Sequence, residues 1–112
     1  KPFIGVHHLA GHLASTYLGT GFSPPYLALL VSGGHSQLLA VHNYTHIQLL
    51  GQTLDDAAGE AFDKVGRLLG VQGGAAVAQL AQSGDPKRYR MPIARTQQPY
   101  DFSFSGLKTY VL

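Results

Sequence analysis

Two apolar runs joined by a glycine pair constrain the fold of this 112-residue chain more than any other feature. The first run, YLALLVS, covers residues 26–32, and the second, QLLAVHN, covers residues 37–43. Each is long enough for a strand, and the intervening GGHS is typical of a tight turn. THIQLLGQT at 45–53 predicts a third strand, so we expect an antiparallel three-stranded meander. Because the first run is apolar throughout, we expect that strand to be buried on both faces.

Three further segments have the apolar spacing of helices. Residues 8–18 carry apolar side chains three and four apart, and glycines and a double proline at 19–25 end the pattern. Residues 56–69 have a one-sided apolar stripe and predict a helix capped by Asp55 or Asp56. Residues 73–84 predict a glycine turn and a short alanine-rich helix.

The remaining segments are shorter or more polar. FIGV at 3–6 is a candidate strand, and residues 85–101, with three prolines, predict a long loop. FSFSG at 102–106 alternates like a short strand, and LKTYVL at 107–112 begins a helix. The whole pattern indicates an α/β or α+β class, with a strand meander and flanking helices.

The chain contains unusually few charged residues. Charged residues make up 12% of the chain, about half of the ~25% usual in soluble domains. One explanation is that protein outside this chain covers much of its surface. The chain begins without Met and stops inside a predicted helix, so we expect a single partial domain over 1–112, an internal fragment.

Two features that would indicate other classes of protein, cysteine residues and a membrane-spanning run, do not occur in the chain. There is no cysteine, which excludes disulfides, thiolate metal sites and cysteine nucleophiles and fits a cytoplasmic protein. No apolar run approaches the ~20 residues that cross a bilayer, so we expect no membrane partner.

Half of the basic residues lie in one short stretch. Lys87, Arg88, Arg90 and Arg95 supply four of the eight basic charges. The stretch is either a solvated loop or a loop that contacts phosphates, and a net charge of +2 does not by itself indicate a nucleic-acid-binding protein.

The stretch GVHHLAGH holds three histidines. On a helix, His8 and His12 lie one turn apart on the same face, close enough to share a metal ion. His7 points about 100° away from His8 and is not expected on the same ion. An isolated pair at this spacing is more often structural than metal-binding, and two ligands are fewer than the three or four that metal sites use. No glutamate stands beside His8, which weakens a metalloprotease interpretation.

Two other segments could bind a nucleotide. Ser32, Gly33 and Gly34 follow an apolar strand, and glycines with positive φ could bring amide groups close to a phosphate, with the Ser32 hydroxyl as a further donor. A plain hairpin turn is the alternative. In the helix after residue 56, Glu60–Lys64 and Asp63–Arg67 have the spacing of ordinary ion pairs, and Asp63 could alternatively bind a ribose hydroxyl.

Taken in order, HHLAGH, LLVSGGHSQL, DDAAGEAFDKVGRLLG and FSFSGLKT resemble the TsaD/Gcp family, the tRNA adenosine threonylcarbamoyltransferases once labelled O-sialoglycoprotein endopeptidases. The resemblance runs almost from end to end, over about the middle third of a full-length member. It implies part of a two-lobed actin/Hsp70/sugar-kinase-like (ASKHA) α/β fold. It also implies an acyltransferase, a tRNA N(6)-L-threonylcarbamoyladenine synthase, which moves threonylcarbamoyl from threonylcarbamoyl-adenylate to the exocyclic amine of the adenosine beside the anticodon.

The resemblance assigns roles to individual residues. His8 and His12 match two ligands of a divalent ion, iron or zinc, whose third protein ligand lies beyond residue 112. Asp63 matches the aspartate that holds the ribose, and Gly74 matches a glycine that touches the nucleoside. In the family, one segment wraps the phosphates of the adenylate or of ATP. The matching residues here are Leu30, Val31, Ser32, Gly33 and Gly34. The implied partners are tRNA, a paralogous subunit of the same fold and an ATPase subunit. No catalytic nucleophile or general base is assigned.

The chain departs from the family pattern in three places. Ala10 stands where many bacterial members have glutamate, and Ala78 stands where some members hold a carboxylate on the nucleoside. VQGGAA is two residues short and lacks the Tyr-Pro before the glycine pair and the proline after it. Because the third metal ligand and the first phosphate-binding strands are not in the chain, we expect these 112 residues alone to be inactive. Alternatives are a carbamoyltransferase of hydrogenase maturation or antibiotic carbamoylation, and a non-catalytic partner subunit of the same fold. The LVSGGHS and GEAFDK segments argue against the former, and His8 and His12 against the latter.

Overall fold

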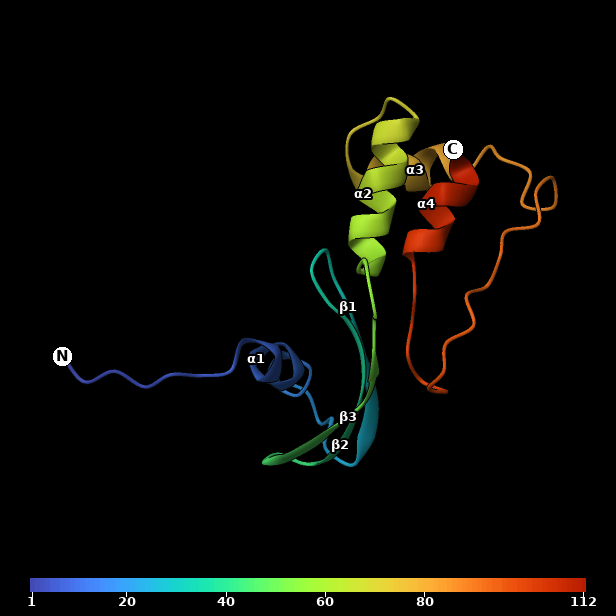
Figure 1. Ribbon diagram of the computed structural model, residues 1–112. Helices are drawn as coiled ribbons and strands as arrows, with labels where there is room; N and C mark the ends of the chain where they lie inside the picture. The colour runs from blue at the N-terminus through green and yellow to red at the C-terminus, as the bar shows by residue number, and fades with distance from the viewer.

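A three-stranded antiparallel sheet organises the computed structural model, which describes residues 1–112 (Figure 1). Strands β1 (Tyr26–Val31), β2 (Ser36–Asn43) and β3 (His46–Gln52) follow in the order β1-β2-β3. In the first pair of strands Leu29 lies opposite Leu38. The predicted meander is confirmed, with each strand boundary within one residue of the expected one.

Strand β1 is buried on one face only, so the prediction that both faces are buried is wrong. Side chains alternate along the strand, and Leu27 and Leu29 are 69% and 63% exposed. Ala28 and Leu30 point to the other face and pack against the core. An apolar run of this kind is therefore compatible with a strand whose second face has no partner within the chain.

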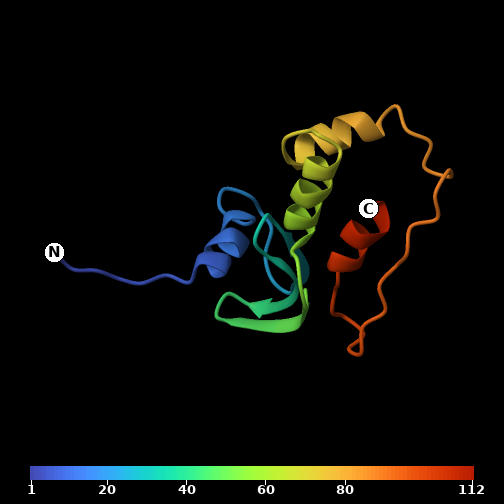
Figure 2. The ribbon, with the colours of Figure 1, turned by 45° about the horizontal axis from the view of Figure 1, so that its top comes forward.

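The sheet packs against the first helix. Helix α1 (His8–Ser15) places Leu13 against Leu39 and Val41 of β2, and these three side chains form the buried core cluster. The helix ends three residues before the predicted limit at 18. The candidate strand at 3–6 does not form, since residues 1–7 extend away from the body (Figures 1 and 2).

Three helices gather at the other end of the molecule (Figure 2). Helix α2 (Ala58–Leu68) packs against both α3 (Gly73–Ala81) and α4 (Ser105–Val111). Helix α2 comes close to α3 at Gly66, where an added Cβ would lie 3.2 Å from the Val77 side chain. The three predicted helices after the sheet are confirmed, but α4 begins at 105, inside the predicted strand 102–106.

The segment before α4 attaches to the end of β3. The amide of Phe102 donates to the Gln52 carbonyl at 3.0 Å, and the Leu54 amide donates to the Phe102 carbonyl at 2.9 Å. Thr53 and Phe102 form a single parallel bridge. The expected strand is thus reduced to one bridge because α4 begins only three residues later. Residues 85–101 contain no helix or strand, as predicted.

Asp55 caps a helix, but not the predicted one. Helix α2 has Ala57 at its N-cap, without a side-chain cap. The Asp55 carboxylate instead accepts hydrogen bonds from the amides of Phe104 and Ser105 at the start of α4, at 2.8 and 3.2 Å. The hydroxyls of Ser103 and Ser105 donate to its other oxygen at 2.5 and 2.8 Å. Partial desolvation alone would raise the pKa of Asp55, but these hydrogen bonds lower it from 3.8 to about 2.

Asp56, the other predicted cap, pairs with a lysine. Lys64 Nζ lies 2.6 Å from Asp56 and 2.9 Å from Glu60. The hydrogen bonds to Asp56 and then Glu60 raise the pKa of Lys64. The predicted Glu60–Lys64 pair is confirmed. The predicted Asp63–Arg67 ion pair does not form, because the Arg67 guanidinium donates to the main-chain carbonyl of Asp63 instead, at 3.4 Å.

Candidate functional site

Helix α1 brings two imidazoles together. His8 is its first residue and His12 lies one turn later, so their Nε2 atoms are 3.2 Å apart. Two nitrogens that each lie about 2.0–2.1 Å from a tetrahedral zinc ion are about 3.3 Å from each other. The 3.2 Å separation is that of a hydrogen bond between the two rings, and it also fits two ligands of one ion.

The surroundings of the pair are open. His7 precedes the helix as its N-cap and lies with His8 and His12 around a shallow hollow of about 300 Å³. An added Cβ at Gly11 would meet nothing within 4 Å, so the glycine leaves this hollow unobstructed. The chain contains no group of three or more histidine, aspartate or glutamate side chains that could hold a metal. A complete coordination shell thus needs a ligand from outside these residues.

The turn at 32–34 is held by the Ser32 side chain. Its hydroxyl oxygen accepts hydrogen bonds from the amides of Gly34 and His35, at 3.3 and 3.0 Å. The Gly33 amide has no acceptor within the chain. The prediction of positive φ at Gly33 and Gly34 is wrong, since positive values occur only at Gly19, Gly70 and Gly73. The Ser32 oxygen, rather than left-handed backbone, forms the turn.

Helix α2 begins directly against this turn. The Gly59 amide donates to the Ser32 carbonyl at 3.2 Å, and an added Cβ at Gly59 would lie 2.7 Å from that oxygen. Ser36, only 2% exposed, accepts the Ala58 amide on its hydroxyl oxygen at 2.9 Å. Sequence reasoning missed both contacts; a glycine in the first turn of a helix was the available signal for the first.

One helical turn further on, Asp63 meets Gly74. The Asp63 Oδ1 atom accepts the Gly74 amide at 2.9 Å, and its Oδ2 atom has no partner within the chain. Gly73 has a φ of +79° and turns the chain into α3. An added Cβ at Gly74 would lie 3.0 Å from Cβ of Phe62, so the close packing of α3 on α2 favours glycine there. The two predicted nucleoside contacts are brought together, although 11 residues separate them.

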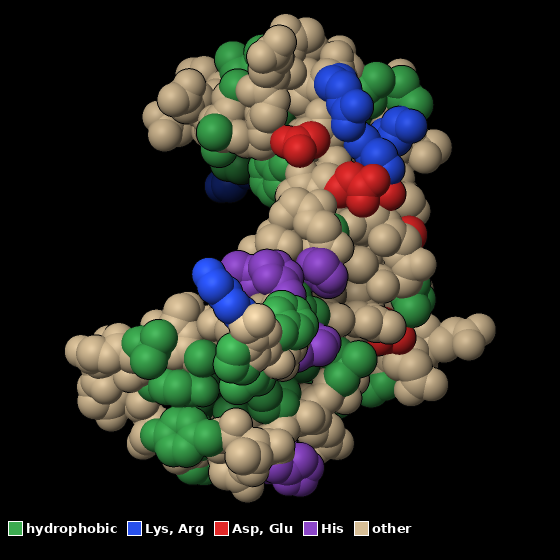
Figure 3. All heavy atoms as spheres, turned by 90° about the vertical axis from the view of Figure 1, so that its left-hand side faces the viewer, with side chains coloured by type: hydrophobic (Ala, Val, Ile, Leu, Met, Phe, Trp, Pro, Cys, Tyr) green, Lys and Arg blue, Asp and Glu red, His purple; other side chains and the backbone are tan.

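A cavity connects His12 with the turn. It has a volume of about 430 Å³, and His12 and Ser32 lie on its wall together with Leu30 and Val31. In the view of Figure 3, the surface of the molecule has a hollow between its upper and lower parts. Histidine side chains gather below the hollow and carboxylates above it (Figure 3). The turn at 32–34 borders the cavity and bonds to α2, so it joins the histidine pair to the Asp63–Gly74 contact.

The arrangement combines groups with distinct chemical capacities. The two imidazoles can coordinate a cation, and the Gly33 amide can donate to an anion. The unpartnered Asp63 oxygen can accept from a hydroxyl. The Ser32 hydroxyl is not paired with a base, since it donates to the His35 main-chain carbonyl and its oxygen accepts two amides. Such a site is suited to hold a phosphorylated ligand beside a metal ion rather than to form a covalent intermediate.

Known proteins match this chain over all or nearly all of its length. The profile of the family described as TsaD, tRNA N6-adenosine threonylcarbamoyltransferase, matches residues 1–112. A tRNA N6-adenosine threonylcarbamoyltransferase of Gloeobacter violaceus is 51% identical over 115 residues, covering 100% of this chain and 34% of the relative. Proteins of the same name from Synechococcus sp. (strain JA-3-3Ab) and Prochlorococcus marinus (strain NATL1A) are 56% and 55% identical. They are aligned with 100% and 98% of this chain, and with 31% and 33% of their own lengths. The chain thus spans about a third of these relatives.

Proposed function

This chain belongs to the TsaD family, and we propose that the protein containing it is a tRNA N6-adenosine threonylcarbamoyltransferase. In the proposed reaction the exocyclic amine of the adenosine beside the anticodon attacks the activated carbonyl carbon of threonylcarbamoyl-adenylate. A new carbon–nitrogen bond forms, the carbon–oxygen bond to the adenylate phosphate breaks, and AMP leaves. The amine loses one proton.

One observation carries the proposal: His12 of the histidine pair and Ser32 of the turn line the same cavity. A cation site and an anion-binding turn on one cavity suit an acyl-phosphate anhydride, whose phosphate is negative and whose carbonyl must be oriented. Attack by an amine on an activated carbonyl needs no protein nucleophile. Positioning and charge stabilisation are sufficient contributions from the protein.

We assign His8 and His12 to the metal, iron or zinc, with a third protein ligand from outside this chain. The 3.2 Å separation of the two Nε2 atoms supports this assignment. When bound, a divalent ion supplies Lewis-acid polarisation of a carbonyl or phosphoryl oxygen. The contribution of the chain is to fix the two nitrogens on one turn of α1, so that both face the same hollow.

The adenylate, or ATP, is assigned to the turn and to α2. The unoccupied Gly33 amide supports a contact with phosphate, and the free Asp63 oxygen supports a hydrogen bond from a ribose hydroxyl. Leu30, Val31 and Gly34 complete the segment that surrounds the phosphates. Gly74 contributes by fixing the Asp63 carboxylate through its amide. The missing prolines around Gly74 do not prevent this contact.

The wider setting follows from the family. We propose a two-lobed ASKHA architecture for the longer protein, with tRNA, a paralogous subunit of the same fold and an ATPase subunit as partners. No helix in the structure combines the length and apolarity needed to cross a bilayer. Because tRNA is the proposed substrate, we propose that the protein acts in the cytoplasm.

The assignment is tested in the longest natural chain that contains these residues. His8→Ala combined with His12→Ala should remove the bound metal, measured by elemental analysis, and abolish threonylcarbamoyladenosine, measured by mass spectrometry of digested tRNA. A second exposed histidine pair supplies the matched control, because the ring centroids of His42 and His46 lie 4.7 Å apart, against 4.6 Å for His8 and His12. His42→Ala combined with His46→Ala should leave both readouts unchanged. Retention of metal and of tRNA modification in the first variant would show that the site is assigned wrongly.

A further inference from the structure

The long loop before α4 carries positive charges that nothing in the chain neutralises. Lys87, Arg88, Arg90 and Arg95 are all exposed, and none lies within ion-pair distance of a carboxylate. Both ion pairs in the structure belong to Lys64 on α2. The nearest acidic residue in sequence, Asp85, accepts the Lys87 amide at 2.9 Å. The loop therefore presents a concentrated positive charge to solvent.

Aromatic and apolar groups accompany these charges. The Arg88 guanidinium lies over the ring of Tyr89, 5.6 Å from its centre. A cavity of about 500 Å³ has Arg90 and Arg95 on its wall together with Pro92 and Ile93. Ile93 is 94% exposed, so its side chain is available to a ligand. Exposed cations interleaved with flat apolar surface are the combination that single-stranded nucleic acids bind.

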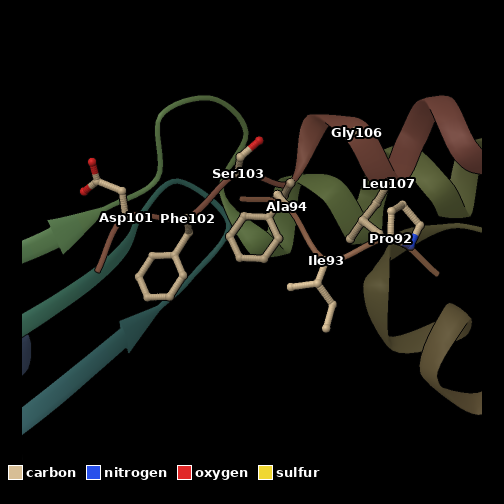
Figure 4. Close-up of a pocket in the computed structure, with 9 residues that line it drawn as sticks. Pro92, Ile93, Ala94, Asp101, Phe102, Ser103, Gly106 and Leu107 are labelled. Atoms are coloured by element: carbon tan, nitrogen blue, oxygen red, sulfur yellow. The ribbon is translucent and has the colours of Figure 1, made fainter. Parts of the chain in front are cut away.

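A second cavity adjoins the first and holds two aromatic rings. It has a volume of about 310 Å³ and shares Pro92 and Ile93 with its neighbour. The rings of Phe102 and Phe104 lie 6.1 Å apart and within 15° of parallel. Figure 4 shows the Phe102 ring and Ile93 on the same side of the chain, with the Asp101 and Ser103 oxygens directed away from them. The cavity thus has an apolar, aromatic wall beside a basic rim.

The loop is anchored at the end nearest these cavities. The Thr96 hydroxyl donates to the Gln98 carbonyl at 2.6 Å, and Asp101 accepts the Gln52 amide of β3 at 3.0 Å. An added Cβ at Gly51 would clash with the Tyr100 carbonyl, so β3 and this segment are in close contact. The aromatic wall is consequently attached to the sheet, which limits the ordering that ligand binding requires.

We propose that the loop at 85–95 and the adjoining aromatic cavity form an RNA-binding surface. The four cations hold the phosphates of a single-stranded stretch, and the cavity between Ile93 and Phe102 takes one unstacked base. Single-stranded RNA is the favoured partner because bases inside an A-form duplex cannot reach an aromatic wall. That the RNA is tRNA rests on the proposed function; the surface itself does not depend on turnover.

The charge contribution is tested by the salt dependence of binding. In the longest natural chain, Arg90→Gln combined with Arg95→Gln should weaken binding of a labelled anticodon stem-loop RNA by about tenfold at low salt. The slope of log affinity against log salt should fall by about 1.4, since each single-strand phosphate contact contributes about 0.7. Lys1→Gln combined with Arg67→Gln removes the same charge elsewhere and should leave the slope unchanged. Equal slopes for the two double variants would overturn the proposal.

The base contribution is tested by comparing the stem-loop with a fully paired RNA duplex of the same composition. Wild-type protein should prefer the stem-loop, and Phe102→Leu should reduce that preference by about fivefold or more through loss of stacking. Phe3→Leu changes another exposed phenylalanine and should have no effect. If Phe102→Leu fails to fold, Ile93→Asn alters the same wall at a fully exposed position. An unchanged preference in every folded variant of this wall would contradict base capture.

Different results would contradict the RNA-binding surface and the proposed transferase function. Loss of RNA binding in the Arg90/Arg95 variant supports the surface even if wild-type protein transfers no threonylcarbamoyl group. Transfer by wild-type protein together with wild-type RNA affinity in that variant refutes the surface and leaves the proposed function intact. Metal content, measured in the same preparations, shows whether the histidine site is retained.

Discussion

Among single residues, Asp63 uses only one of its two carboxylate oxygens within the chain. One oxygen accepts the Gly74 amide at 2.9 Å, and the other is free. Asp63→Asn keeps an oxygen for Gly74 but removes the negative charge. Because hydrogen bonds to charged groups contribute about 1.5–3 kcal/mol and neutral ones about half as much, we predict roughly tenfold weaker nucleotide binding. Calorimetric titration with ATP measures this, with Asp85→Asn as the control; equal affinities for Asp63→Asn and wild type would exclude the ribose contact.

The ionisation of Asp55, also a single residue, makes the stability of the fold depend on pH. Its pKa is lowered to about 2, so its contribution to stability is complete above pH ~4 and is lost as the pH falls toward 2. We predict that the Asp55 carboxyl carbon titrates near 2 in NMR spectra. Protection of the Phe104 and Ser105 amides should decrease over the same interval. Asp55→Asn should show weaker protection without this titration, and a carboxyl midpoint near 3.8 in wild type would show that the cap does not form in solution.

Among the elements, the junction between the turn at 32–34 and α2 leaves no room for a side chain. A Cβ at Gly59 would lie 2.7 Å from the Ser32 carbonyl oxygen and 2.8 Å from the Gly33 Cα. Since both obstacles are backbone atoms, Gly59→Ala must displace the turn, and we predict a destabilisation of about 1–3 kcal/mol together with weaker nucleotide binding. Gly106→Ala in α4 meets nothing within 4 Å and should be neutral or stabilising. Thermal unfolding compares the two, and identical melting temperatures would contradict the junction geometry.

The elements also show what local sequence can predict. Strand periodicity and turn residues located all three strands, because these signals lie within a few residues of each other. The Asp55 cap could not be predicted, since its partners lie 48 to 50 residues away. The strand expected at 102–106 is limited to its single bridge with Thr53, because α4 begins at Ser105. The histidine pair followed from helical spacing, whereas the closeness of Asp63 and Gly74 depends on how α3 turns back onto α2.

At the scale of the whole molecule, the chain is open. Its radius of gyration is 17.1 Å, against about 13 Å for a compact domain of this length. Only eight of the 112 residues are buried, and Leu27 and Leu29 leave one face of the sheet uncovered. These side chains form an apolar surface that remains exposed in the structure.

The prediction at this scale concerns activity. We predict that the 112 residues alone do not modify tRNA in a reconstituted assay, because the histidine pair lacks a third ligand within the chain. They should also bind a hydrophobic dye such as ANS through the uncovered sheet face. The longest natural chain is the positive control. Modification by the 112 residues alone would show that the two histidines and the turn are sufficient.

The large sequence separation between Asp55 and its hydrogen-bond partners has a consequence for biosynthesis. Its carboxylate emerges from the ribosome before Ser103, Phe104 and Ser105, its hydrogen-bond partners. At about 5–20 residues per second, some 50 residues take roughly 3–10 s to synthesise. The sheet and α2 can form in that interval, whereas α4 cannot dock until it ends. Translation therefore assembles the histidine pair and the turn at 32–34 first and adds the aromatic cavity last.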